Sequence, residues 1–413
     1  MCAAPHVFIL HRMNDVYIYD HVRTPRGKGR PDGALHEVTP VRLAAGVLAG
    51  LRERNGFDAD AIDDVGFGIV MPVGEQGADL TRYALLAAGY GDSVAGYQLN
   101  RFCTSALDTL KYGHALIASG QAEAVIGGGT ESMSRVALGS DGGAAYTDPE
   151  IGRHHPYIPN GVAADLMAAL GGHTREALDA YAAQSQRRAA VAQAQGRFAR
   201  SLRPVRDMIG ELLLEHDETI RPNTTAADLA KLKPAFAAIG AEGFDSIVLR
   251  RYAQLAGFEH VHTSGNSSGI VDGACAVLLG SRAFGARYGI APRARIVGSA
   301  SCASEPLLSL GGPMPATRRI LQTAGMTVRD IDLFEVNEAF AVVPLAYMRH
   351  FDLDPERVNV NGGAIALGHP LGATGAILLG TVLDELERRN LATALVTLCA
   401  AAGQATAMVI ERV

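Results

Sequence analysis

The chain has 413 residues, of which 48% are hydrophobic and 19% are charged; this excludes a disordered chain and leaves room for two or three domains. The formal net charge is -6 and no long basic run occurs, which argues against a nucleic-acid partner.

The first 135 residues alternate β-branched runs with Ala- and Leu-rich segments, a pattern typical of an α/β fold with buried strands. In chain order, this pattern predicts strands at 16–19, 65–70 and 122–126, and helices at 41–55 and 107–119. The third strand is expected to end in a loop at Gly127, Gly128 and Gly129.

The composition then changes between residues 136 and 261. A loop rich in Gly, Pro and His at 141–161 is followed by polar helices and a charged, hairpin-like piece. We interpret this stretch as an insertion, because it breaks the layered alternation on either side of it.

After the insertion, the first alternation returns, with strands expected at 295–297, 333–335 and 393–398 and helices at 316–324 and 375–389. In each half a reactive side chain, Cys103 or His369, opens a helix that leads to a strand and a small-residue run. This repetition indicates an internal duplication. The predicted domains are 1–135 plus 262–290, the inserted 136–261, and 291–413.

Five cysteines are too few and too widely spaced for a disulfide framework or a zinc ribbon; they are Cys2, Cys103, Cys275, Cys302 and Cys399. Free thiols suit a reducing compartment. The apolar run at 7–10 is too short for a signal peptide, and no stretch approaches the ~20 apolar residues of a membrane span. We expect a cytoplasmic protein without a membrane partner.

Cys103 is placed by the pattern at or near a helix N-terminus. There the helix dipole and free backbone N–H groups would stabilise a thiolate and lower the thiol pKa from ~8.5. We interpret Cys103 as a candidate nucleophile, and the alternative is a buried structural cysteine.

His369 lies in a glycine-rich segment, 359–375, that reads NVNGGAIALGHPLGATG. Such a backbone turns tightly and lets another group approach closely. The spacing does not match a phosphate-binding loop, because no lysine follows the glycines. An imidazole that activates a thiol fits better, and the alternative is a histidine that only caps a turn.

Two further side chains follow predicted strands. Cys399 closes the strand at 393–398, at the strand end where α/β folds place functional groups, and its thiol could move a proton. Asn337 follows the strand at 333–335, where its amide could orient a water or polarise an oxyanion, or else cap a helix. Cys2, Cys275 and Cys302 have no comparable context.

Taken together, these segments resemble the thiolase family from residue 16 to residue 413. The matching motifs are 359–375, the Asn-Glu-Ala-Phe run at 337–340, the loop at 263–269, and the shorter runs at 23–25 and 129–134. The resemblance implies a duplicated five-layer αβαβα fold with an inserted loop domain, and a homodimer or homotetramer. It also implies acyl-CoA and CoA as substrates, with no metal or redox cofactor.

The resemblance also implies roles for individual residues. Cys103 would be the acylated nucleophile, His369 its base, Cys399 the group that moves the proton at the substrate α-carbon or on the leaving thiol, and Asn337 the holder of a water at the enolate oxygen. The remaining matched positions are Cys103 and Ala401 for a second oxyanion hole with Gly403 beside it, Ala339 and Phe340 for the substrate, Ser268 for pantetheine and Arg221 for the CoA adenine.

Five positions depart from the family pattern: Thr104, Ala106, Ala401, Ala402 and Asp228. Alanine disfavours positive φ, so the pair after Cys399 could narrow the acyl pocket, and an aspartate could repel phosphate. The expected activity is therefore acetyl-CoA acetyltransferase or 3-ketoacyl-CoA thiolase, in either direction. The alternatives are a weakly active acyl-CoA-binding relative and, with less support, a ketoacyl synthase relative.

Overall fold

The computed structural model describes residues 14–413; Cys2 and the apolar run at 7–10 therefore lie outside the described residues. A ten-stranded mixed sheet forms the framework, in the order β10-β11-β12-β9-β1-β8-β5-β3-β4, with β2 beside β8. Its strands are β1 (Tyr17–Arg23), β2 (Gly27–Lys28), β3 (Asp64–Gly68), β4 (Ala95–Leu99), β5 (Ala124–Ser132), β8 (Val271–Gly280), β9 (Ala294–Ala303), β10 (Leu333–Val336), β11 (Thr393–Cys399) and β12 (Gln404–Arg412).

The helices divide into those that pack on this sheet and those of the inserted region. The first group comprises α1 (Pro40–Asn55), α2 (Leu80–Ala87), α3 (Ser105–Ala118), α11 (Arg282–Tyr288), α12 (Pro313–Ala324), α13 (Val342–Phe351) and α15 (Thr374–Arg389). The short helix α14 (Ala364–Leu367) packs instead on α7 (Arg175–Ala194) of the inserted region. Helix α1 shows why these segments are helical: Pro40 opens its first turn, and Gly56, at φ 65°, ends it in a left-handed cap.

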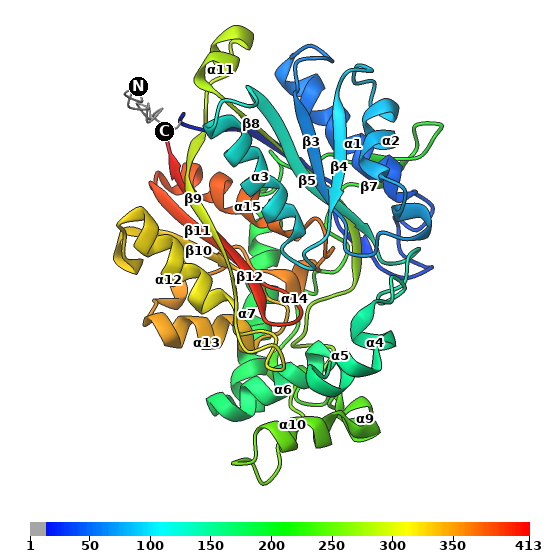
Figure 1. Cartoon of the computed structure of the whole chain (residues 1–413), viewed down its shortest axis with the longest axis vertical. Coiled ribbons are helices and arrows are strands. Elements are labelled where there is room, and N and C mark those ends of the chain that lie inside the picture. The colour runs from blue at the N-terminus through cyan, green and yellow to red at the C-terminus, as the bar shows by residue number, and fades with distance from the viewer. Residues whose placement is uncertain (1–13) are drawn as a thin grey trace, which may run out of the picture.

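The sheet and its helices form five layers, as the resemblance implies. Helices α1 and α2 cover the half-sheet β4-β3-β5-β8-β1, and α12 and α13 cover the half-sheet β9-β12-β11-β10. Between the two half-sheets lie α3 and α15, which pack against each other (Figure 1). The half-sheets meet where Tyr17 and Ile18 of β1 pair with Arg295 and Ala294 of β9.

The strand order repeats in the two halves, in agreement with an internal duplication. The first half runs β4-β3-β5-β8-β1, and the second runs β10-β11-β12-β9. The position that β4 occupies beside β3 is filled in the second half by a single parallel bridge between Phe334 and Val358. As a result, α3 and α15 occupy equivalent places, and the residues that precede them face the same region.

Strand β5 corrects one expectation. Gly127, Gly128 and Gly129 do not form a loop after the strand but lie inside it, because β5 continues to Ser132. They allow close packing: a Cβ at Gly127 would lie 2.5 Å from Cδ2 of Leu110 on α3, and one at Gly129 would lie 2.0 Å from the carbonyl oxygen of Gly372. Because these glycines lack side chains, α3 and the turn at Gly372 can pack closely against β5.

The inserted region extends from the sheet in Figure 1. Its elements are α4 (Ala144–Thr147), α5 (Pro149–His154), α6 (Asn160–Gly171), α7 (Arg175–Ala194), β6 (Val205–Arg206), β7 (Leu212–Leu214), α8 (Ala226–Leu229), α9 (Ala237–Ile239) and α10 (Asp245–Arg251). The hairpin β6–β7 confirms the expected hairpin-like piece. Helices α6 and α7 pack on α13 of the second half, and the segment around Ser201 and Arg203 is hydrogen-bonded to Arg23 of the first half, so the insertion contacts both halves.

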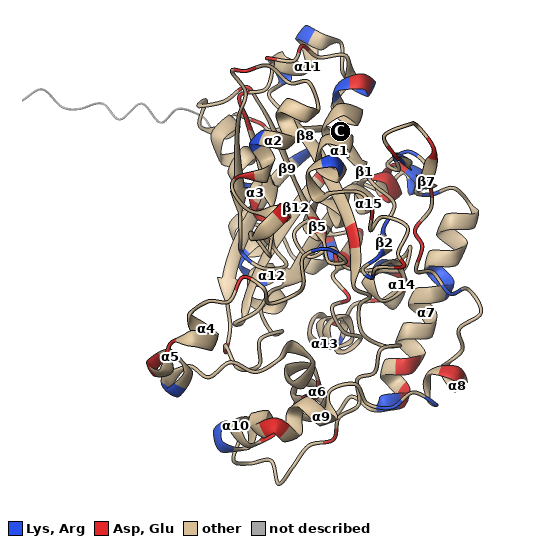
Figure 2. Ribbon diagram, turned by 90° about the vertical axis from the view of Figure 1, so that its right-hand side faces the viewer, with Lys and Arg blue, Asp and Glu red and all other residues tan. Residues whose placement is uncertain are grey.

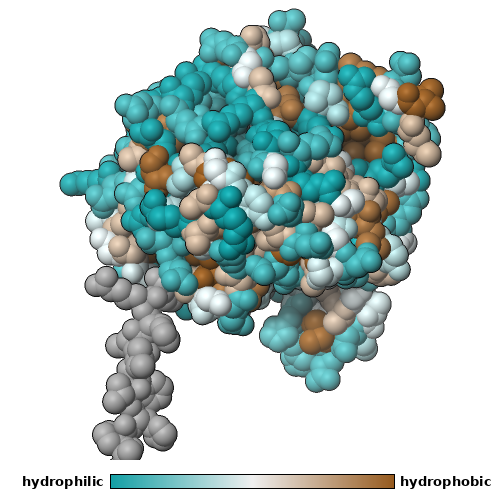
Figure 3. All heavy atoms as spheres, turned by 90° about the horizontal axis from the view of Figure 1, so that it is seen from above, coloured by the Kyte–Doolittle hydropathy of each residue, from teal (hydrophilic) through white to brown (hydrophobic). Residues whose placement is uncertain are grey.

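The surface carries mixed charge and scattered apolar groups. In Figure 2 basic and acidic residues are interspersed along the ribbon, and in Figure 3 apolar residues lie among hydrophilic ones. Within residues 14–413, no helix combines the length and the apolar character that crossing a membrane requires.

Candidate active site

The starts of the two central helices lie against each other. Cys103 lies two residues before α3 and His369 five residues before α15. A Cβ at Gly375, in the first turn of α15, would lie 2.5 Å from the backbone nitrogen of Leu107 on α3. Only a glycine permits this approach, so the duplication brings the segments of Cys103 and His369 into one place.

The imidazole of His369 is buried and held in one tautomer. Its Nδ1 lies 2.6 Å from Oγ1 of Thr374, and this hydroxyl donates its only hydrogen to the carbonyl oxygen of Pro370 at 2.9 Å. The Thr374 oxygen must therefore accept the Nδ1–H hydrogen. This leaves Nε2 unprotonated, and Nδ2 of Asn337 donates to it at 3.3 Å. The lone pair with which the imidazole can accept a proton is therefore at Nε2.

The position of His369 differs from the expected one. It does not open a helix but lies in a turn between α14 and α15, where its backbone N–H donates to the carbonyl oxygen of Gly269 at 2.9 Å. Gly368 has φ 87°, and a Cβ there would lie 2.2 Å from Cγ1 of Val271. The turn can be made only with glycine at this position.

Asn337 directly follows β10, and Cys399 is the last residue of the neighbouring parallel strand β11. Val336 of β10 pairs with Thr397 of β11, and the backbone N–H of Asn337 donates to the carbonyl oxygen of Thr397 at 3.0 Å. The Oδ1 atom of Asn337 is buried and has no hydrogen-bond partner among residues 14–413. An orphaned acceptor in a buried polar site is suited to a water or a substrate donor.

The two thiols and the imidazole are uncharged in this environment. Desolvation raises the pKa of the Cys103 thiol, although part of its surface is exposed, and the charge of Glu131 adds to the effect. Burial raises the pKa of Cys399, and a thiolate at the neighbouring Cys103 would raise it further. Burial and the charge of Arg26 lower the pKa of His369 to about 3. For the Cys103 thiol this direction is opposite to the lowered pKa expected at a helix end, because desolvation disfavours the thiolate.

The small residues after Cys399 form a strained turn. Ala402 has φ 58° and Gly403 has φ 77°, whereas Ala401 is not in the left-handed region. A Cβ at Gly403 would lie 2.6 Å from the carbonyl oxygen of Ser304, so this glycine is required. The strain expected from the two alanines therefore resides at Ala402 alone.

The substrate-side loop at 263–269 lies on the Asn-Glu-Ala-Phe run. The backbone N–H of Ser268 donates to the carbonyl oxygen of Ala339 at 3.0 Å, and Ser267 pairs with Phe340. The Phe340 ring meets His262 and Phe236 edge-on, with centroids 5.5 and 5.8 Å apart. The loop that carries Ser268 and the run that carries Ala339 and Phe340 are thus in direct contact.

The other predicted residues have local roles. Arg221 is exposed, and its backbone N–H donates to Oε1 of Gln186 at 2.7 Å; no contact joins it to Cys103 or His369 within the described residues. Asp228 caps α8 through Thr225 and pairs with Lys231 at 3.0 Å, which offsets its charge. The hydroxyl of Thr104 bonds to Arg101 and Asp108 at the start of α3, and Ala106 is fully buried.

Sequence reasoning missed a buried carboxylate, Glu131, that holds the histidine turn. Its Oε2 accepts from the backbone N–H groups of Gly372 (2.8 Å) and Val70 (2.9 Å), and its Oε1 accepts from Met71 N–H (3.1 Å) and Gln76 Nε2 (2.7 Å). A charged side chain among the small residues of 127–132 was the available signal, since such a group is seldom buried without a network of donors.

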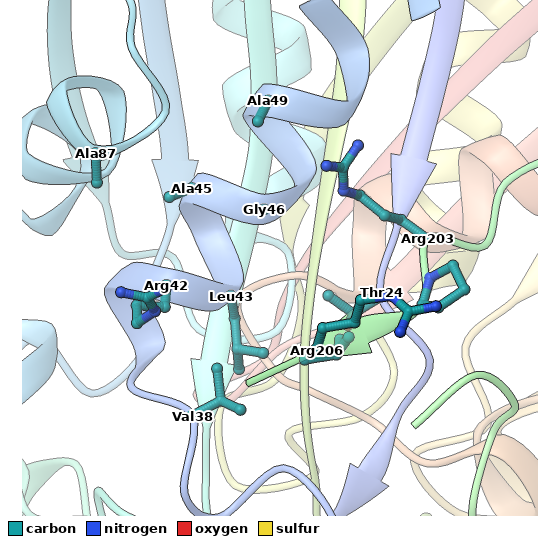
Figure 4. A pocket seen from close by; sticks show the side chains of 12 residues that line it. Thr24, Val38, Arg42, Leu43, Ala45, Gly46, Ala49, Ala87, Arg203 and Arg206 are labelled. Carbon is teal, nitrogen blue, oxygen red and sulfur yellow. The ribbon is translucent and has the colours of Figure 1, made fainter. Parts of the chain in front are cut away.

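A cavity of about 320 Å³ lies apart from these residues, between α1 and the segment 203–206 (Figure 4). Thr24, Leu43, Ala45 and Ala49 line it, and arginines 42, 203 and 206 stand around it. None of the predicted site residues contributes to it. Among residues 14–413 there is also no group of three or more His, Cys, Asp or Glu placed to hold a metal ion.

Comparison with known proteins adds an independent observation. Family models described as the thiolase N-terminal domain and the thiolase C-terminal domain match residues 16–242 and 290–412. A β-ketoadipyl-CoA thiolase of Pseudomonas putida is 39% identical over 97% of this chain and 100% of its own. A 3-ketoacyl-CoA thiolase of Saccharophagus degradans is 36% identical over 97% and 98%, and an acetyl-CoA acetyltransferase of Rhizobium meliloti is 37% identical over 93% and 96%.

Proposed function

The chain belongs to the thiolase family and is a CoA-dependent acyltransferase, and on that premise we propose that Cys103, His369, Cys399 and Asn337 carry its reaction. The observation that supports this most is the tautomer of His369, whose unprotonated Nε2 is held beside Asn337 in a buried site. A neutral imidazole next to a neutral thiol is the state from which a general base can act.

In the cleavage direction, the proton of the Cys103 thiol passes to Nε2 of His369 while the sulfur attacks the ketone carbon of a 3-ketoacyl-CoA. The bond between the α-carbon and the former ketone carbon breaks, and the α-carbon takes the proton of the Cys399 thiol. Acetyl-CoA leaves, and the shortened acyl group stays on Cys103 as a thioester.

A second CoA then completes the cycle. Its thiol gives a proton to the Cys399 thiolate and attacks the acyl thioester, and the Cys103 sulfur leaves with the proton from His369. Condensation is the same sequence reversed. Only CoA and acyl-CoA enter these steps, so the proposal includes no metal or redox cofactor.

Both negative oxygens need donors in a water-poor site. We assign the enolate oxygen to a water held by Asn337 and His369, which the orphaned Oδ1 of Asn337 supports. We assign the tetrahedral oxygen to the N–H groups of Cys103 and Ala401, with Gly403 setting the turn. Loss of one such donor costs ~2.7–4 kcal/mol of transition-state stabilisation.

The substrate contacts follow the family pattern. We expect the path of the pantetheine and acyl chain to be lined by Ser268, Ala339 and Phe340. Backbone hydrogen bonding connects the two segments that carry these residues. Arg221, exposed on the inserted region, would meet the CoA adenine. We propose β-ketoadipyl-CoA as the preferred substrate, in keeping with the relative from Pseudomonas putida, and acetoacetyl-CoA as the second candidate.

We further propose that copies of the chain associate through the end of the sheet. Strand β4 is the last strand in the order, and a shallow hollow beside it is lined by Tyr97, Leu99, Tyr112 and Leu116. An unpaired strand edge next to exposed apolar groups favours pairing with a second chain. Light scattering of the purified protein would test this, and a monomer at micromolar concentration would contradict it.

Intact-mass analysis after incubation with acetoacetyl-CoA, β-ketoadipyl-CoA or a long straight-chain 3-ketoacyl-CoA tests the main proposal. We expect an acyl adduct on Cys103 and turnover upon addition of CoA. Cys103→Ser should lose both while Cys302→Ser, at a partly exposed cysteine outside the site, retains them. Turnover in Cys103→Ser would overturn the assignment, and the ranking of kcat/KM among the three substrates decides the acyl group.

A further inference from the structure

Arg26 is a buried guanidinium that touches the backbone next to His369. It lies between β1 and β2 and is 2% exposed. Its Nη1 donates to the carbonyl oxygen of Gly368 at 3.2 Å, and its backbone N–H donates to Oδ1 of Asp217 at 3.0 Å. Gly368 directly precedes His369, so Arg26 is hydrogen-bonded to the peptide group that links the two residues.

The charge of Arg26 has no carboxylate of its own. Arg23 already binds both oxygens of Asp217 at 2.8 Å, and Arg26 reaches the same carboxylate only through Nε at 3.3 Å. Although burial opposes ionisation, the two arginines hold the pKa of Asp217 well below its usual range. Two guanidinium groups thus share one carboxylate, which leaves one net positive charge in the buried cluster.

The neighbouring acids do not neutralise this charge. Burial raises the pKa of Glu335 well above its ordinary value and raises that of Cys275 to about 12, so burial disfavours the charged form of both. Burial lowers the pKa of Arg26 itself only to about 10, which leaves it protonated.

We propose that Arg26 is a positioning residue for His369: its hydrogen bond fixes the turn before the histidine, and its unbalanced charge adds to burial in disfavouring the imidazolium, so that Nε2 stays a base. The proposal rests on the function proposed for His369. It adds that this base is protected by a cation and not oriented by a carboxylate, the partner commonly used to stabilise an imidazolium.

The groups around the ring agree with this role. Asn337 and Thr374 contact the two ring nitrogens, and neither is ionised. The carboxylate of Glu131 is bonded to Gly372, further along the turn, and the thiols of Cys103 and Cys399 are protonated. Within the described residues no carboxylate is hydrogen-bonded to the ring. Burial first, and then the Arg26 charge, lower the pKa of His369 to about 3.

Three variants separate the charge from the hydrogen bond. Arg26→Met removes both, Arg26→Gln keeps an N–H donor without charge, and Arg26→Lys keeps the charge. The fold should survive, because Arg23 and Asp217 remain as a neutral bidentate pair. Arg42→Met, at an exposed arginine lining the separate cavity, is the matched control.

We expect the acid limb of kcat/KM to move up by about one pH unit in Arg26→Met and Arg26→Gln, with KM little changed, and to stay in place in Arg26→Lys and Arg42→Met. Nitrogen-15 NMR of the imidazole, assigned with His369→Ala, should show the same rise in protonation without any turnover. An unmoved limb in Arg26→Met, or a shift in Arg26→Lys equal to that in Arg26→Met, would overturn the proposal. A wild-type protein without thiolase turnover would instead refute the proposed function. The NMR comparison does not require turnover, so it tests the role of Arg26 separately.

Discussion

The hydroxyl of Thr374 holds the imidazole of His369 in a single tautomer, by accepting Nδ1–H at 2.6 Å while donating to the carbonyl oxygen of Pro370. The base at Nε2 therefore depends on the first residue of α15, which follows the turn that contains the histidine. This relationship makes Thr374 as informative a mutation site as the histidine itself.

We expect Thr374→Val to lower kcat at least about 10-fold, because Nδ1–H and the Pro370 carbonyl lose their partner and the ring can adopt the wrong tautomer. The unfolding free energy should fall by about 1–3 kcal/mol from the unsatisfied buried groups. Thr374→Ser keeps the hydroxyl and should keep most of the activity. Equal kcat in the valine and serine variants would show that the tautomer is held by something else.

Replacing the base itself should have a larger effect. His369→Ala is expected to lower kcat about 10²–10⁴-fold, the range of general-base catalysis, and to slow acyl-enzyme formation in rapid-quench experiments. His114→Ala, a histidine on α3 without a role in the site, is the control. Normal acylation in His369→Ala would assign proton removal from Cys103 to another group.

Glu131→Gln tests the support of the histidine turn. Four N–H donors surround this carboxylate, so an amide must present its own N–H₂ group to at least one of them. We expect a loss of about 2–3 kcal/mol in unfolding free energy and a kcat about 10–100-fold lower from the displaced turn. Glu123→Gln, at a partly exposed glutamate paired with Arg287, should change neither.

Asp217→Asn tests the buried arginine pair and has a defined pH dependence. The variant leaves two buried guanidinium groups without a carboxylate, which should cost about 3–5 kcal/mol at pH 7. Because the pKa of Asp217 lies below its unfolded value of about 3.9, its contribution is present above that pH and is lost as pH falls toward the folded value.

The gap in thermal midpoint between wild type and Asp217→Asn should therefore shrink as pH falls below about 4. Asp228→Asn, at an exposed residue of α8, serves as a comparison and should show a small, flat difference. A gap that stays constant down to pH 3 would mean that Asp217 is not the ionised partner of the two arginines.

Ala402→Gly should stabilise the protein by about 1 kcal/mol, because alanine at φ 58° carries the steric cost of the left-handed region. Ala401→Gly is the matched control: without positive φ at this position, glycine should lower stability by about 0.5 kcal/mol. Urea unfolding of both variants measures the difference. A destabilised Ala402→Gly would place the strain elsewhere.

Much of the framework follows from local pattern, and the exceptions have physical causes. The predicted helices at 41–55, 107–119 and 375–389 agree with α1, α3 and α15 within a few residues, because apolar spacing and capping residues mark them. Strands β8 and β12 were missed: their Ala, Gly and Met content gives little strand signal, although most of their residues are buried between layers.

The central residues of the site could be found from sequence, but their electrostatics could not. Cys103 stands just before the apolar pattern of a helix and His369 stands among glycines, and a sequence displays both signals. The neutral state of both, and the influence of Arg26, depend on how far the folded chain excludes water and on a cation nearly 350 positions away along the chain, which only the fold brings near.

The contact between Gly375 and Leu107 has a consequence for the two repeats of the chain. The sulfur is supplied by one repeat and the ring nitrogen by the other, so each repeat carries half of a reaction centre. A single-repeat ancestor could have completed such a centre only across a subunit boundary. For the same reason, separately expressed halves should regain turnover only after they reassociate.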